Sequence, residues 1–355
     1  MPRVTTSETA RIIGDPDATD QHLCPVWWDN RKLVQVPHEL RKCVCFVGGQ
    51  RGHLRGVGAA FFVGDPLGVH DVAAVYVVTA KHCVQPLDHQ ENGPFHKTWL
   101  RVNLRHAGSM HLEIPPEMWV CHETADVAVL PLALNMNTFD YLYYPIRNGA
   151  TAEFIKRHSV TPGEDVFITG LLISHPGKSR VLPIVRVGNI AAFPADPINL
   201  LTGHDSAYLV EVRSLGGLSG SPAFVHLLPV HAGATGNLGI SVREIGTGGR
   251  TYLMGLVHGF FPTTENDPDG IVEWAQEPLN TGISVVVPLE RVLDIIDSPA
   301  FVEQREAAKM RLNAGHMPAP AILREHVEFV RFEDLAAGHV TIIKQGAEEV
   351  DRDHL

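Results

Sequence analysis

The sequence has little of what marks secreted, membrane-bound or nucleic-acid-binding proteins. Its first ten residues hold no apolar core of signal-peptide length, and no uninterrupted apolar run approaches membrane-spanning length. Basic residues are in the minority, because 29 Lys and Arg stand against 40 Asp and Glu, a formal net charge of −11. Phosphate binding needs a concentrated basic surface. We therefore expect neither a membrane nor a nucleic acid among the partners.

Cysteine is also scarce, and its arrangement excludes the common metal sites. There are five cysteines, an odd number without metal-type pairing: Cys24, Cys43, Cys45, Cys83 and Cys121. No H-E-x-x-H motif occurs among the 20 histidines, and no Cys/His pairs stand at ligand spacing. The sequence thus predicts no metal and no cofactor. Together with the missing leader, it favours a soluble cytoplasmic protein in a reducing compartment.

The composition that remains is that of a globular protein built from short strands. The 355 residues are 45% hydrophobic and 19% charged, enough for more than one domain's core. Gly (32) and Pro (25) are plentiful, as expected where turns join many strands. Apolar, β-branched runs predict strands at 40–47, 57–63, 72–79, 99–104, 118–121, 127–132, 165–170, 181–192, 207–212, 223–226, 253–258 and 283–287. Helical spacing predicts helices over 288–297 and 302–312.

One turn carries the residues for nucleophilic chemistry. Ser219 lies in Gly216-Gly217-Leu218-Ser219-Gly220-Ser221-Pro222, between glycines and just before a predicted strand. Glycine permits backbone angles that a Cβ blocks, so successive N–H groups can converge on one spot where an oxyanion would be held. Gly/Ser turns are also common as purely structural loops. This turn alone does not decide between the two.

Two further motifs precede that turn. The apolar run 77–84 ends in His82 and Cys83, and Asp126 stands at the head of the apolar run 127–132. The order is His, Asp, Ser. An α/β-hydrolase would instead run Ser, Asp, His and would use G-x-S-x-G, whereas position 221 here is Ser.

The three motifs resemble the T-A-x-H-C, D-x-A-[VL]-L and G-x-S-G-[GS]-P signatures of chymotrypsin-like (trypsin-like) serine peptidases, of an intracellular, bacterial type. The resemblance covers roughly residues 41–297. It implies an all-β fold of two antiparallel β-barrels with a C-terminal helix and a short extension. The implied divisions are an N-terminal arm (1–36), a first β-barrel with His82 and Asp126 (37–145), a second β-barrel with Ser219 (146–288), and a C-terminal helix and extension (289–355).

The same resemblance implies a mechanism and a substrate class. Ser219 would be the nucleophile, His82 its general base, and Asp126 the residue that orients the imidazole. The backbone N–H groups of Gly217 and Ser219 would form the oxyanion hole. The expected activity is that of a serine endopeptidase, which cleaves protein or peptide substrates through an acyl-enzyme.

Four residues match positions of the substrate pocket in the resembled family. They are Arg213, His258, Gly259 and Phe260. Arg213 at the base of the pocket would favour an acidic or polar side chain in the substrate, although a following acidic loop would neutralise Arg213 or attract basic substrates. His258 falls where many members carry a serine that touches the catalytic aspartate. It would therefore bond Asp126, border the pocket, or serve the structure alone.

The sequence does not decide how the expected peptidase activity is regulated. Leu218 replaces the aspartate with which the digestive enzymes bind a new N-terminus, so activation through that ion pair is excluded. The Gly-rich insertion 227–249 is either a gate or a plain solvent loop. The strand before His82 lacks the cysteine that pairs in secreted members, so Cys83 is expected to be a free thiol. The alternatives to a constitutive peptidase are a catalytically silent binding module and a peptidase gated by a regulatory protein partner.

Overall fold

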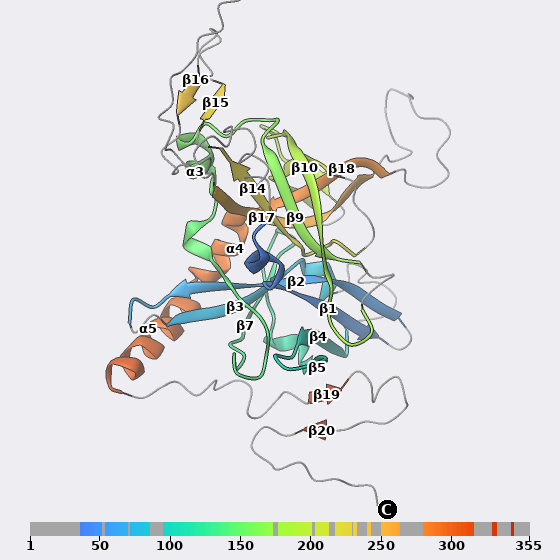
Figure 1. Cartoon of the computed structure of the whole chain (residues 1–355), viewed down its shortest axis with the longest axis vertical. Helices are drawn as coiled ribbons and strands as arrows, with labels where there is room; N and C mark the ends of the chain where they lie inside the picture. The colour runs from blue at the N-terminus through green and yellow to red at the C-terminus, as the bar shows by residue number, and fades with distance from the viewer. Residues whose placement is uncertain are drawn as a thin grey trace, which may run out of the picture. The chain divides into compact units, whose positions relative to one another are not determined.

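The structure is a computed structural model of the 355-residue chain (Figure 1). It describes residues 36–51, 54–69, 72–85, 95–172, 177–200, 203–212, 217–228, 230–232, 240–242, 250–262, 280–315, 329–331 and 342–343. These residues are mostly strands, which form a large sheet built chiefly from the first half of the chain, a closed barrel from the second half and two small hairpins. Two helices follow the barrel along the chain. The predicted all-β fold class is confirmed. The N-terminal arm lies almost wholly outside the described residues.

Strands from the first half of the chain form one ten-stranded sheet, which two short strands near the C-terminal end of the chain complete. Its order is β20-β19-β5-β4-β1-β2-β3-β7-β6, with β8 pairing in parallel to β2. Long antiparallel neighbours such as β2 and β3 alternate buried side chains between two layers, which gives the sheet its apolar core. Its strands are β1 (Val44–Arg51), β2 (Leu54–Pro66), β3 (Ala73–Thr79), β4 (Lys97–Asn103), β5 (Ser109–Ile114), β6 (Val120–Cys121), β7 (Ala128–Pro131), β8 (Tyr144–Pro145), β19 (Phe329–Arg331) and β20 (Ile342–Ile343).

The second half is a closed six-stranded barrel. Its order is β10-β13-β18-β17-β14-β9, and every neighbouring pair is antiparallel. Its strands are β9 (Asp165–Leu171), β10 (Pro183–Ala192), β13 (Tyr208–Glu211), β14 (Pro222–Leu227), β17 (Arg250–Pro262) and β18 (Asn280–Pro288). Two small hairpins lie between these strands: β11 (Ile198–Leu200) with β12 (Gly203–Asp205), and β15 (Val230–Ala232) with β16 (Ile240–Val242). The second hairpin falls within the predicted insertion 227–249.

Helices are few and mostly short. The longest two are α4 (Leu289–Ile296) and α5 (Pro299–Asn313), as the periodicity over 288–297 and 302–312 predicts. On α4 the buried residues recur three and four apart, so one face of the helix packs on the strands. The others are α2 (His38–Arg41), α3 (Ala152–Arg157), and the 3₁₀ turns η1 (Lys81–Cys83), η2 (Pro116–Met118) and η3 (Ile146–Asn148). None of the helices described is both long and apolar enough to cross a membrane.

Some strands begin at other residues than predicted, and one strand was not predicted; the causes lie in the local sequence. The first strand begins at Val44, because Leu40 belongs to the helical turn α2. Met118 closes the 3₁₀ turn η2, which begins after Pro115 and has proline at its first position. Strand β5 was not predicted, since its residues Ser109–Ile114 include a histidine and a glutamate among the apolar ones.

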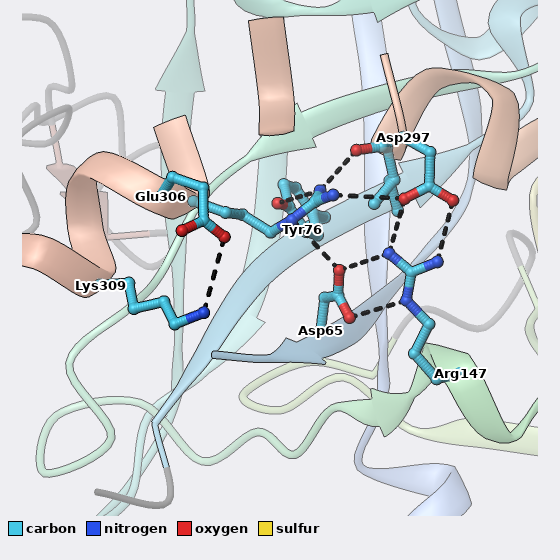
Figure 2. Close-up of polar contacts among 8 residues, drawn as sticks. Asp65, Tyr76, Arg147, Asp297, Glu306 and Lys309 are labelled. Atoms are coloured by element: carbon cyan, nitrogen blue, oxygen red, sulfur yellow. Dashed lines mark hydrogen bonds and ion pairs between the residues drawn. The ribbon is translucent and has the colours of Figure 1, made fainter. Parts of the chain in front are cut away.

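Ion pairs fasten the C-terminal helices to the first sheet (Figure 2). Asp65 at the end of β2 accepts two hydrogen bonds from Arg147, at 2.8 and 2.7 Å. Arg147 makes a second pair of bonds to Asp297, which follows α4. Arg305 of α5 contacts both carboxylates and the Tyr76 hydroxyl. The cluster thus connects the strands β2 and β3 to the α4–α5 corner.

Candidate active site

A histidine-anchored turn presents Asp126 between β6 and β7. The His122 Nδ1 atom accepts hydrogen bonds from the backbone N–H groups of Thr124 (3.2 Å) and Ala125 (2.9 Å). Lys81 donates to the His122 carbonyl at 3.0 Å, which ties this turn to the η1 segment. The side chain of Asp126 is fully buried.

His82 meets Asp126 through two hydrogen bonds. It lies on η1, directly after β3, where the chain leaves the sheet. Its backbone N–H donates to Asp126 Oδ1 at 3.0 Å, and its ring Nδ1 lies 2.8 Å from Oδ2. With Nδ1 donating to the carboxylate, Nε2 is the ring atom left to act as a base.

His258 of β17 reaches the same carboxylate from the second half of the molecule. Its Nδ1 lies 2.5 Å from Asp126 Oδ2, and its ring meets that of His82 edge to face, with centroids 5.5 Å apart. Its side chain is 7% exposed. The sequence left open whether His258 bonds Asp126, borders the pocket or serves the structure alone. In the structure its ring lies against Asp126.

Ser219 lies on the turn before β14 and joins this group through its backbone and its hydroxyl. Its hydroxyl donates to the His258 carbonyl at 3.0 Å, and its own carbonyl accepts the Ala59 N–H at 2.8 Å. The Cys83 thiol contacts the same Ser219 carbonyl at 3.8 Å. Ser219 therefore lies against both the strand of His258 and the residue after His82.

Gly220 is required by this close approach. Its φ of +79° is in the left-handed region, and a Cβ there would come within 2.4 Å of Thr79 Oγ1 and still closer to the Ala59 carbonyl. The two halves of the molecule thus meet at the turn of Ser219 without room for a side chain. Gly217 has a φ of +101°, and neither its N–H nor that of Ser219 donates to another described residue.

Burial and hydrogen bonding shift the pKa values of Asp126 and His82 in opposite directions. Burial alone would raise the pKa of Asp126, but the hydrogen bonds from His258 and His82 outweigh it and hold the pKa well below its ordinary value. Burial alone would lower the pKa of His82, but Cys83 and the Asp126 carboxylate raise it well above its ordinary value. Asp126 is therefore a carboxylate at neutral pH, and His82 binds a proton readily.

The three side chains also form the kind of set that can bind a metal. The nearest ligand atoms of His82, Asp126 and His258 lie within 4.8 Å of one another. Zn²⁺ with bonds of about 2.1 Å in a tetrahedral site separates its ligand atoms by roughly 3.4 Å. The Nδ1–Oδ2 distances of 2.5 and 2.8 Å are shorter and suit shared protons. Hydrogen bonding accounts for the cluster without an ion.

The remaining predicted pocket residues are only partly described. Arg213 and the acidic loop lie outside the described residues, and so does the side chain of Phe260. Gly259 is described, and a Cβ there would meet nothing within 4 Å. Cys83 is a buried free thiol, as expected. Sequence reasoning missed His122, whose only sequence signal is its position four residues before Asp126.

Comparisons with known proteins find similarity in fold only. No family model and no curated protein matches the chain. Among solved structures, the MamO protease domain from Magnetospirillum magneticum is 17% identical, with a TM-score of 0.43, over 74% of this chain and 99% of its own. The serine protease AL20 from an extremophilic microorganism is 13% identical (TM-score 0.40; 72% and 94% covered). Protease Anisep from Arthrobacter nicotinovorans is also 13% identical (TM-score 0.38; 72% and 94% covered).

Proposed function

We propose that the protein is a serine endopeptidase that cleaves protein substrates through an acyl-enzyme on Ser219. One observation carries the proposal: a fully buried carboxylate, Asp126, binds both the backbone N–H and the ring Nδ1 of His82. This arrangement fixes the imidazole with Nε2 as the free base, which is what activation of a serine hydroxyl needs.

The chain's own residues suffice for each proton transfer in this reaction. His82 Nε2 takes the proton of Ser219 as Oγ forms a bond to the scissile carbonyl carbon. The same proton then passes to the leaving amine as the peptide C–N bond breaks, which leaves an ester on Oγ. Water, deprotonated by His82, hydrolyses that ester. Asp126 remains ionised throughout and stabilises the imidazolium, while the N–H groups of Gly217 and Ser219 bind the oxyanion in this proposal.

The orientation of Ser219 supports a second candidate, a gated or silent form of the same fold. Its hydroxyl donates to the His258 carbonyl and so is not directed at His82. For proton transfer the hydroxyl must turn from this carbonyl to His82 Nε2, and side-chain rotations take picoseconds to nanoseconds for an exposed residue. A regulatory partner that favours this rotation would act as an activator. A protein that never makes it would be a binding module.

Labelling with a fluorophosphonate probe tests the proposed nucleophile. We expect the wild-type protein to be labelled and Ser219→Ala to lose all labelling. Ser221→Ala is the matched control: it lies two residues away, and its buried hydroxyl has no partner among the described residues. Labelling that survives in Ser219→Ala, or disappears equally in Ser221→Ala, contradicts the assignment.

Unlabelled wild-type protein is resolved by adding cell extract. Labelling of Ser219 restored by the extract identifies a gated peptidase and a missing activator. Continued silence supports the binding module instead. For a labelled protein, a peptide library varied at the residue before the cleaved bond gives the specificity and decides between a preference for acidic or polar side chains and one for basic side chains.

The proposed compartment is the cytoplasm. Among the described residues, Cys43, Cys45, Cys83 and Cys121 are all free thiols, which is typical of a reducing environment. Burial raises the pKa of Cys43 to about 12, so this thiol is not poised for reaction. Cell fractionation of the tagged protein, with a secreted control, tests the location.

A further inference from the structure

The ring of His122 supports the turn that leads into Asp126. Its Nδ1 atom accepts the backbone N–H groups of Thr124 at 3.2 Å and Ala125 at 2.9 Å. An imidazole nitrogen that accepts hydrogen bonds holds no proton, so the ring is neutral and its one proton is on Nε2. The two backbone bonds thus define the tautomer that this turn requires.

The other side of the ring faces the C-terminal helix α4. The Nε2–H group of His122 donates to Asp294 Oδ2 at 3.3 Å, and Arg291 contacts the same oxygen at 3.4 Å. The Asp294 side chain is 51% exposed, so this bond should contribute little. Ala125 is only 1% exposed, and its bond to Nδ1 is better shielded from water. The bonds at Nδ1 should therefore matter more than the bond at Nε2.

The backbone of His122 connects the same turn to the segment of His82. Its carbonyl accepts a hydrogen bond from the ammonium group of Lys81, the residue before His82, at 3.0 Å. Its N–H donates to the carbonyl of Val127, the residue after Asp126, at 2.9 Å. His122 therefore contacts the chain on both sides of Asp126 and the chain next to His82.

We propose that His122 is a positioning residue, which sets the turn that presents Asp126 to His82 by accepting two backbone N–H groups on Nδ1. The inference rests on the proposed peptidase function for its kinetic consequence, whereas its structural consequence does not depend on activity. Asp126 accepts the backbone N–H of His82 at 3.0 Å and its ring N–H at 2.8 Å. Hydrogen bonds of this kind weaken steeply once their geometry departs from the ideal, so a displaced turn would loosen both.

Asparagine provides a matched conservative variant at this position. Its Oδ1 is separated from Cβ by one carbon, as Nδ1 is in histidine, and asparagine oxygens commonly accept backbone N–H groups a few residues ahead. His122→Asn thus keeps an acceptor for the turn, and His122→Ala removes it. Glu123→Ala is the control within the turn, because Glu123 is exposed and its side chain has no hydrogen-bond or ion-pair partner among the described residues.

The first measurement is ¹⁵N NMR of the histidine-labelled wild-type protein at neutral pH, which distinguishes a protonated ring nitrogen from a bare one. We expect the ring of His122, assigned by its loss in His122→Asn, to hold a proton on Nε2 and none on Nδ1. A proton on Nδ1 overturns the proposal, because that atom could then accept neither N–H group.

The second measurement uses the proton on His82 Nδ1 as a reporter of the position of Asp126. Its resonance, assigned by its loss in His82→Asn, should lie far downfield in wild type and remain in His122→Asn. In His122→Ala it should shift or broaden, because its acceptor is no longer held in place. An unchanged resonance in folded His122→Ala overturns the proposal. Thermal melting verifies folding, and His122→Leu, which fills the space without an acceptor, takes the place of an unfolded alanine variant.

The third measurement is the rate of fluorophosphonate labelling. His122→Ala should label about tenfold more slowly, the effect of about one ordinary hydrogen bond, while His122→Asn and Glu123→Ala should stay within about threefold of wild type. The loss should lie in the maximal rate and leave the half-saturating probe concentration unchanged. An equal loss in His122→Asn, or a change in the half-saturating concentration alone, would overturn the proposal, because the acceptor on the turn would then not be decisive.

These measurements separate the two proposals. If wild type is never labelled, the peptidase function fails, while the two NMR results still decide whether His122 positions Asp126. If wild type is labelled and His122→Ala labels equally fast, the function stands and the positioning role fails.

Discussion

Replacing Asp65 by asparagine should destabilise the protein markedly, because the Asp65 carboxylate is the buried centre of an ion-pair cluster. The Asp65 side chain is 7% exposed and binds Arg147 at 2.8 and 2.7 Å and Arg305 at 3.3 Å (Figure 2). Removing one partner of a buried pair costs about 3–5 kcal/mol. The Arg147 side chain is 41% exposed and keeps its bonds to Asp297, so we expect the lower end, about 3 kcal/mol.

Asp297→Asn is the matched control in the same cluster. It contacts the same two arginines, but its side chain is 43% exposed, and exposed pairs contribute about 0–1 kcal/mol. The hydrogen bond from Arg147 is the chief cause that lowers the pKa of Asp297. A lowered pKa means that the ion pair stabilises the charged carboxylate, so the loss of the pair should destabilise the protein. At about 2 °C per kcal/mol for a chain of this size, the melting temperature should fall by about 6 °C in Asp65→Asn and by at most about 2 °C in Asp297→Asn.

Thermal unfolding at pH 7, followed by circular dichroism, measures both variants against wild type. A fall in melting temperature as large in Asp297→Asn as in Asp65→Asn would refute the reasoning, because burial would then not decide the cost. High salt should reduce the effect of Asp297→Asn and leave most of that of Asp65→Asn, since buried pairs are screened less.

Two further predictions concern the site. The pKa of His82 is raised well above its ordinary value of 6.5, so the base is lost by protonation as the pH falls through that raised pKa. We therefore expect the rate of fluorophosphonate labelling to fall to half its maximum at a pH above 6.5. A pH–rate profile that reaches half its maximum only below about pH 6 would contradict this. Gly220→Ala should slow labelling at least about tenfold, because the added Cβ collides with Ala59 and Thr79, and should destabilise the protein by about 2–4 kcal/mol. Gly163→Ala is the control, since it has a positive φ but open space, and should cost only about 1 kcal/mol without slowing labelling.

Much of the site could be predicted because its motifs are local. A histidine after a β-branched run, an aspartate before another and a serine between glycines each show in fewer than ten residues. The position of His258 could not be decided in the same way, because a histidine on an apolar strand can face either side of it. Strand β5 was missed for a related reason: its pairing with β4 places polar residues such as Glu113 within a ladder that the neighbouring strand completes.

The sequence by itself determined the all-β class, the order of the three motifs and the need for glycine in the turn of Ser219. These properties depend on side-chain alternation and on backbone angles within a few residues. Only the tertiary structure decided that Asp126 is shared by His82 and His258, which lie on different halves of the molecule. The Asp126–His258 contact spans 132 residues of chain. Its 2.5 Å distance exists because the two halves pack together at the Ser219 turn, a long-range result that no local pattern encodes.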